Sequence, residues 1–182
     1  IFVFVNDEFS YDKFQSKKDR IYRVQYFIQE FNIANVPPVF AEHLGDFFPE
    51  IEKTARLFTR NTSVQVDGGQ VGLRKFEEEN IIFADSSAFD IFDFQLMEGS
   101  LDNPLHEPFT AILSEDLAKK YFGNQSAIGK SFKMEGKTFS VSAVVKAYPN
   151  QSHFHFNMLV PYTNMYDLEP EPLGSGLRNA FK

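Results

Sequence analysis

The stretch from Ile81 to Lys146 constrains the fold more than any other part of the chain, because its elements have marked ends. Ser114 stands before two acidic residues and an apolar series, as is typical of a helix N-cap, and Gly123 suits the C-terminal end of that helix. A Glu135-Gly136 turn between two apolar segments predicts a hairpin. Strand, helix and hairpin follow without a regular βαβ alternation, so the stretch predicts an α+β fold.

Periodicity and the positions of Pro and Gly predict the remaining elements. We expect helices at 6–18, from Pro37-Pro38 to near Phe48, at 89–92 and at 114–123. We expect strands at 19–31, 51–59, 63–66, 71–76, 81–84, 94–97, 109–113, 131–134, 138–145 and 154–160, and loops at 32–35, 102–108, 149–152 and 162–182.

Three local features carry further expectations. Phe40, Leu44 and Phe47 recur at i, i+4 and i+7, which predicts a helix stripe facing the core. The acidic run 77–80 is expected to be a solvent-facing turn, and Asp85 or Ser86 to cap the helix that follows it.

Composition narrows the class of protein. The net charge of −7 argues against nucleic-acid binding, which depends on basic patches. The absence of cysteine excludes disulfides and thiolate metal sites, and it fits the cytosol and an extracytoplasmic location equally. The 22 phenylalanines favour a packed aromatic core over disorder.

A Gly-Lys-Ser triplet at 129–131 resembles the end of a phosphate-binding loop. Five residues separate Gly123 from Gly129, where the motif requires four. The expected order is also reversed, with a helix before and a strand after. We therefore predict a helix end and a turn, and no nucleotide or other cofactor site.

His153 and His155 would lie on one side of a strand, and a metal pair there would need a third ligand from elsewhere in the fold. Their default role is structural or at the surface. Asp85, Asp90 and Asp93 do not have calcium-loop spacing, and we expect them to cap or end helices. Paired carboxylates for glycoside cleavage stay open.

Ser114 lacks the flanking glycines of a nucleophile elbow, and capping accounts for it fully. We therefore assign no catalytic, cofactor-binding or metal-binding residue, and we expect the chain not to be an enzyme.

Seven short segments occur in a characteristic order. They are DEFSYDKF (7–14), DRIYRV (19–24), FPEIE (48–52), ADSSAFDIFDF (84–94), LSEDLAKKYFG (113–123), IGK (128–130) and NQSHFHF (150–156). Together they resemble the MacB-like periplasmic core domain of MacB/FtsX-type ABC transporter permeases. The resemblance spans residues 7 to 156, and it is the combination that is specific.

The resemblance implies a porter-like α/β sandwich with an inserted, strand-rich, sabre-like part. It places at 1–18 a juxtamembrane helix, which follows transmembrane helix 1 of the permease. It places the porter-like part at 19–98, the sabre-like part at 99–160 and a returning loop at 161–182. Ile1–Val5, which by itself fits a buried strand or a helix end, would be the membrane exit. Family members continue past the position of Lys182, so the return half of the porter-like part is expected to be missing or disordered.

The resemblance also implies a function. The chain would be the periplasmic domain of an inner-membrane permease in a Gram-negative cell, and it would couple ATP-driven helix motion to export or extraction of a substrate. The implied partners are a cytoplasmic ABC ATPase, a second permease and a periplasmic adaptor or lipoprotein. The alternative is an extracytoplasmic ligand-binding or sensor domain of a membrane receptor. A hydrolase using the aspartates is a weaker rival.

Overall fold

The computed structural model describes residues 14–28, 31–33, 36–69, 72–149, 152 and 154–168. The helices are η1, a 3-10 helix (Lys18–Arg20), α2 (Val39–Phe47), α3 (Ala88–Ile91), α4 (Glu115–Phe122) and α5 (Asn164–Leu168). The strands are β1 (Tyr26–Ile28), β2 (Phe31–Ile33), β3 (Leu57–Asp67), β4 (Leu73–Ala84), β5 (Leu96–Gly99), β6 (Thr110–Ser114), β7 (Ser131–Met134), β8 (Lys137–Val145) and β9 (Met158–Pro161). This mixture of helices and strands confirms the α+β class.

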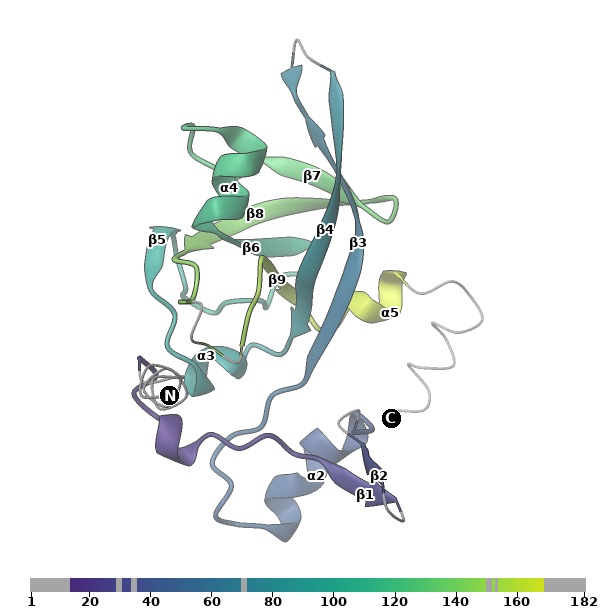
Figure 1. The fold of residues 1–182 in the computed structure, drawn as a ribbon, viewed down its shortest axis with the longest axis vertical. Helices are drawn as coiled ribbons and strands as arrows, with labels where there is room; N and C mark the ends of the chain where they lie inside the picture. Colours follow the sequence, from purple (N-terminus) through teal and green to yellow (C-terminus); the bar gives the residue numbers. More distant parts are fainter. Residues whose placement is uncertain are drawn as a thin grey trace, which may run out of the picture.

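Strand pairing closes most of the sheet into a ring. Among the described residues the sheet has the order β5-β8-β6-β9-β4-β3-β7, and β7 also pairs with β8. The closure depends on β7, whose Met134 lies opposite Val64 of β3 and Lys137 of β8. Strand β5 pairs with the far end of β8, where Leu96 lies opposite Val145. The result is a six-stranded barrel with β5 added beside it (Figure 1).

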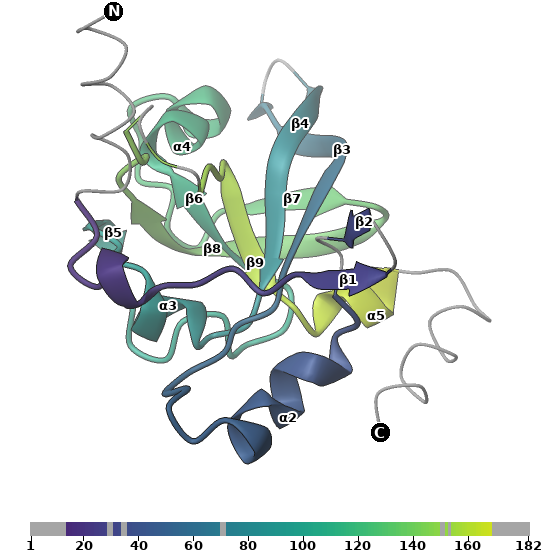
Figure 2. The same cartoon turned by 60° about the horizontal axis from the view of Figure 1, so that its bottom comes forward.

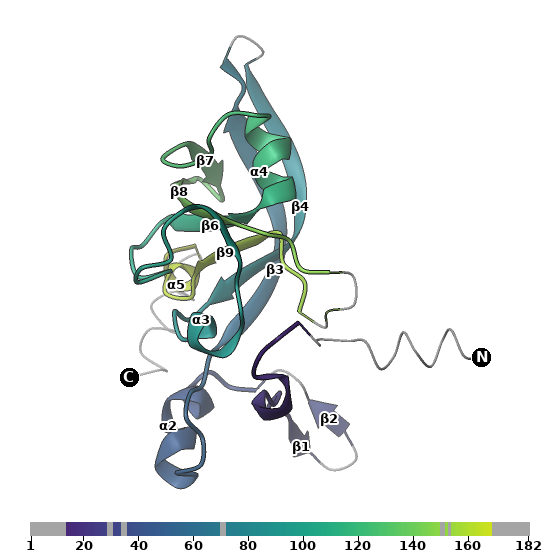
Figure 3. The ribbon, with the colours of Figure 1, turned by 90° about the vertical axis from the view of Figure 1, so that its left-hand side faces the viewer.

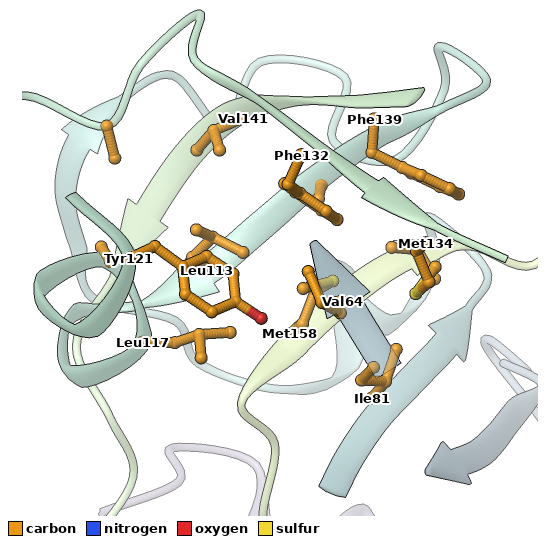
Figure 4. Close-up of a cluster of buried hydrophobic side chains, with 14 of the residues drawn as sticks. Val64, Ile81, Leu113, Leu117, Tyr121, Phe132, Met134, Phe139, Val141 and Met158 are labelled. Carbon is orange, nitrogen blue, oxygen red and sulfur yellow. The ribbon is translucent and has the colours of Figure 1, made fainter. Parts of the chain in front are cut away.

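Large apolar side chains fill the ring, and α4 packs against them. Tyr121 and Leu117 of α4 point into a cluster of apolar residues (Figure 4), which come from the six strands β3, β4, β6, β7, β8 and β9. The labelled members are Val64, Ile81, Leu113, Leu117, Tyr121, Phe132, Met134, Phe139, Val141 and Met158. Strand β4 is covered on both faces, because Ile81 and Phe83 belong to this cluster, whereas Ile82 and Ala84 belong to a second one.

The structure confirms the predictions for the elements whose ends are defined by a cap, turn or proline residue. The Ser114 hydroxyl accepts a hydrogen bond from the Leu117 N–H at 3.3 Å, and Gly123 follows α4 with φ +65°. The hairpin β7–β8 turns at Glu135-Gly136, as expected. Helix α2 begins after Pro38 and ends before Phe48.

The turn predicted at 77–80 is wrong, although Glu77, Glu79 and Asn80 are exposed as predicted. These residues continue β4, and the Glu78 side chain is only 3% exposed. Lys120 of α4 donates to Glu78 Oε1 at 2.7 Å, so the buried carboxylate has a charged partner. The predicted cap of α3 is wrong too, because Ser87 precedes that helix without a side-chain cap.

The N-terminal predictions are mostly corrected. Instead of one strand at 19–31, the structure has η1, an extended segment and the short strand β1, and β2 replaces part of the predicted loop at 32–35. Of the predicted helix at 6–18, residues 6–13 lie outside the described residues. The two strands predicted at 51–59 and 63–66 form the single strand β3, which begins later, at Leu57. Strand β9 also begins later than predicted, at Met158, and α5 occupies the start of the predicted C-terminal loop.

Helix α2 does not bury the predicted stripe. Phe40 and Phe47 are 48% and 75% exposed, and no residue of α2 is buried. Figures 2 and 3 show α2 lying outside the ring of strands, on the side away from the tip of the β3–β4 hairpin. Its attachment to the barrel is therefore made by a few polar contacts.

The predicted boundary between residues 98 and 99 falls inside β5. Strands β3 and β4, before this boundary, pair with β7 and β9 after it. One sheet thus takes strands from both predicted parts, and their assignment as porter-like and sabre-like stays a prediction.

Across the described ranges, no helix combines the length and the apolar character that a membrane crossing requires.

Gly99 offers a test of the junction between β5 and β8. Its φ is +86°, and an added Cβ would lie 2.4 Å from the Ser142 carbonyl oxygen. We expect Gly99→Ala to lower the free energy of unfolding by about 2–4 kcal/mol in urea denaturation. Gly129→Ala is the control, because its φ of +74° is similar but nothing lies within 4 Å of the added Cβ. A loss of about 1 kcal/mol is expected there, and equal losses at the two sites would contradict the steric explanation.

Candidate functional site

Arg56 joins the segment before β3 to the end of β4. Its Nε and Nη2 donate to the two carboxylate oxygens of Asp85, each at 2.9 Å. The Arg56 backbone N–H donates to the same carboxylate at 2.8 Å. A bidentate guanidinium–carboxylate pair fixes both distance and orientation, so this pair determines how the chain enters the barrel.

The same guanidinium reaches two more elements. Its Nη1 lies 3.0 Å from Glu42 Oε1 on α2, and its central carbon lies 4.3 Å from the centre of the Tyr162 ring, just after β9. Contact of a cation with an aromatic face is favourable. We call Arg56, Asp85, Glu42 and Tyr162 the Arg56 joint.

Burial makes the Arg56 joint sensitive to loss of a partner. The side chains of Arg56 and Asp85 are 19% and 24% exposed. The hydrogen bond to Asp85 raises the pKa of Arg56 above its usual value, against the opposing effect of burial. Burial also raises the pKa of the Tyr162 phenol to about 12.

Two hydroxyl groups extend the joint along the chain. Ser87 Oγ donates to the Thr54 carbonyl at 2.6 Å, and Thr54 Oγ1 donates to the Ala41 carbonyl at 2.7 Å. The segment at 54–56 is thus bonded to α2 on one side and to the start of α3 on the other.

An aromatic cluster lies beside α3. Phe92 stacks on Phe154 with ring centres 4.7 Å apart, and Phe89 stacks on Phe94 at 4.3 Å. The other contacts come from the N-terminal segment and from the β8–β9 connection. The members of the aromatic cluster are Phe14, Phe89, Phe92, Phe94, Tyr148, Phe154 and Phe156.

Residues 14–20, which we call the strap, contact the loop that follows α3. The Ser16 backbone N–H and hydroxyl both donate to the Asp93 carboxylate, the hydroxyl at 3.0 Å. Asp93 returns a bond from its own N–H to Gln15 Oε1 at 2.7 Å, and Lys17 donates to the Asp90 carbonyl. The bonds from Ser16 lower the pKa of Asp93.

An open groove of about 560 Å³ runs along α3. It contains an ion pair between Lys53 and Asp90, whose charged atoms are 3.4 Å apart. Its lining is mixed, with polar and apolar side chains: Lys53, Ser86, Ser87, Phe89, Asp90, Phe94, Leu101, Asp102, Asn103 and Pro104.

The three aspartates singled out in the sequence have separate partners. Asp85 pairs with Arg56, Asp90 with Lys53, and Asp93 with Ser16. The capping role predicted for Asp85 is replaced by its bonds to Arg56, whereas Asp90 and Asp93 lie at and just after the end of α3, as predicted.

The prediction for the two histidines can be compared with the structure at His155, which is exposed, whereas His153 lies outside the described residues. In the part of the chain that the structure describes, no three His, Asp or Glu residues are grouped so as to hold a metal ion. Ser114 is buried and caps α4. Gly129 and Lys130 of the Gly-Lys-Ser triplet lie between α4 and β7, and Ser131 begins β7. The Lys130 ammonium donates to Gln125 at 2.6 Å.

No pattern in the sequence indicated a functional role for Arg56. It lies 29 residues from Asp85, and no spacing rule connects the two. The available signal was Asp85 itself, which follows a buried strand and opens the ADSSAFDIFDF segment.

The fold and these contacts define a strand-rich α+β domain with a bonded N-terminal extension. The model of the MacB-like periplasmic core domain family matches residues 1–178. The chain belongs to this family.

Two solved structures support the same fold. One is a domain assigned to a permease protein from Porphyromonas gingivalis, with a TM-score of 0.63 and 21% identity over 73% of this chain and 55% of that chain. The other is the periplasmic region of MacB from Actinobacillus actinomycetemcomitans, with a TM-score of 0.58 and 19% identity over 84% of this chain and 63% of that chain. This chain therefore spans less than two thirds of either structure. No curated protein matches it significantly.

Removal of the Arg56 charge tests the joint. Arg56→Met keeps the length of the side chain but leaves Asp85 partly buried without its cation, so we expect a loss of about 2 kcal/mol in the free energy of unfolding. Arg20→Met is the control, because the Arg20–Glu52 pair is exposed on both sides and should contribute less than about 1 kcal/mol. Denaturant titration measures both, and similar losses would argue against a special role for Arg56.

Alkaline titration tests the burial of Tyr162. Its folded pKa, about 12, lies above the ordinary tyrosine value of 10.0, so the folded state binds this proton more tightly than the unfolded state. Its contribution to stability is complete below pH 10 and is lost as the pH rises from about 10 to about 12. We expect Tyr162→Phe to weaken the fall in unfolding free energy across this window. An unchanged slope would show that Tyr162 is not protected from ionisation.

Proposed function

We propose that the chain is the periplasmic domain of an inner-membrane ABC transporter permease of the MacB/FtsX/Lol type. It couples ATP-driven movement of the membrane helices to export or extraction of a substrate, or to the action of a periplasmic partner. The full-length permease pairs with a cytoplasmic ABC ATPase and a second permease, and a periplasmic adaptor or lipoprotein is a further partner. The domain itself catalyses no reaction.

The Arg56 joint is the observation that supports the coupling role, which family membership alone does not establish. A domain that passes on movement needs an orientation-fixing contact between its entry segment and its rigid body. Arg56 supplies this contact through a bidentate bond to the end of β4 and a second bond to α2. The barrel behind Asp85 has a close-packed apolar interior, and such interiors transmit strain.

The aromatic cluster supports the same role. It joins Phe14, near the entry of the chain, to α3 and to the β8–β9 connection. Stacked rings resist sliding because their contact area is large and their preferred geometries are few. Movement of the entry segment therefore reaches α3 and the β8–β9 connection.

The groove along α3 favours a second candidate, an extracytoplasmic ligand-binding or sensor domain. The two candidates differ in the rest of the reading frame. A permease has one membrane span before Ile1 and three after the domain, with an ATPase gene beside it. A receptor has an output module such as a kinase.

Phe92→Ala tests coupling in the full-length permease reconstituted with its ATPase in nanodiscs. With any cysteines outside this cysteine-free chain replaced, Lys133→Cys places one spin label on the exposed face of β7 in each protomer. We expect ATP to change the distance between the labels, and Phe92→Ala to reduce this change while ATP hydrolysis continues, because the Phe92–Phe154 stack is lost.

Phe122→Ala is the matched control, since it removes a half-buried ring from α4, away from the aromatic cluster. A folded Phe92→Ala variant with a full distance change would contradict the coupling role. The absence of any ATP-dependent change in the unaltered permease would contradict the proposed function.

A further inference from the structure

Two attachments of different character connect the N-terminal segments to the barrel. The Arg56 joint is largely buried, with two side-chain bonds and one backbone bond to a single carboxylate. In the strap attachment Ser16 and Asp93 are exposed, whereas Gln15 is buried. Hydrogen bonds at exposed positions compete with water and open more readily than buried ones.

The strap contact is specific despite its exposure. Ser16 donates twice to the Asp93 carboxylate, and Asp93 donates once to Gln15. Carboxylate acceptors form stronger bonds than neutral ones. Because Gln15 and Ser16 are both bonded to Asp93, which accepts from one and donates to the other, the strap has a single closed position.

Closure of the strap also has a cost. The Gln15 side chain is 3% exposed, and its Nε2 group has no hydrogen-bond partner in the described part of the chain. A buried donor without an acceptor favours the open position, where water can satisfy it. The bonds to Asp93 and this unsatisfied amide therefore oppose each other.

Little else bonds the strap to the barrel within the described residues. Lys17 donates to the Asp90 carbonyl, and the Phe14 ring lies 4.9 Å from that of Tyr148. The other strap bonds are local turns or lead to Glu52, which belongs to the N-terminal side. Release of Asp93 therefore removes most of the directional contact.

We propose that the strap is a releasable latch and that the Arg56 joint is the pivot about which it opens. The Gln15–Ser16 contact with Asp93 closes in one state of the transport cycle and opens in the other, while Arg56 stays bonded to Asp85. This inference rests on the proposed function for the source of the movement. It adds that the contact of Gln15 and Ser16 with Asp93 breaks during the movement, whereas the contact between Arg56 and Asp85 stays intact.

Hydrogen exchange in the full-length permease tests the latch. We expect Asp93→Ala to increase exchange at the Ser16 amide about tenfold, with no change at the Arg56 amide. Asp102→Ala is the matched control, because it removes another exposed carboxylate whose bonding partner in the described part of the chain is nearby Ser100. In the unaltered protein, ATP should change exchange at Ser16 and leave Arg56 protected. Equal exchange at Ser16 in both aspartate variants would overturn the latch.

A cross-link provides the second arm. Ser16→Cys and Asp93→Cys, bridged by a disulfide or a short bis-thiosulfonate reagent, should hold the strap closed. With the label attached at Lys133→Cys through a thioether after the bridge has formed, we expect the bridged complex to lose the ATP-dependent change in label distance and to recover it after reduction. A bridged complex that moves as the unbridged one does would overturn the proposal.

The two arms separate the latch from the function on which it rests. If ATP never changes the label distance in the unbridged permease, the proposed function fails. The exchange comparison between Asp93→Ala and Asp102→Ala then still decides whether Asp93 holds the strap closed, because that contact does not depend on ATP.

Discussion

The bond between Arg56 and Asp85 is the contact on which the arrangement of the molecule depends. It connects the segment leaving α2 to the end of the most buried part of β4. Because α2 buries no residue of its own, its position relative to the barrel is set by Arg56 and a few neighbouring hydrogen bonds. Polar geometry, rather than apolar packing, therefore determines how the two parts of the chain meet.

The barrel and the N-terminal segments are stabilised in different ways. The barrel buries alternating apolar residues on the inside of a closed ring, and its outer side near α3 is covered by aromatic rings. The N-terminal segments expose large apolar side chains, including Phe40 and Phe47, and depend on ion pairs. This contrast fits a rigid body joined to a part that changes its position.

Local signals predicted the elements whose ends are chemically marked. Ser114, Gly123 and Gly136 each require a particular backbone or cap, so α4 and the β7–β8 hairpin could be placed from the sequence. The continuation of β4 through Glu78 could not, because its charge partner Lys120 lies 42 residues later. Arg56 and the strap were missed for the same reason, since their partners are distant in sequence.

Closure of the strand ring through β7 has a consequence for the behaviour of the domain outside the cell membrane. An open sheet carries unpaired backbone groups along two edges, and such edges recruit strands from other chains. Here β7 bonds to β3 on one side and to β8 on the other, so six strands have neighbours on both sides over part of their length. The closed ring therefore offers fewer unpaired edges to other chains than an open sheet of the same strands would.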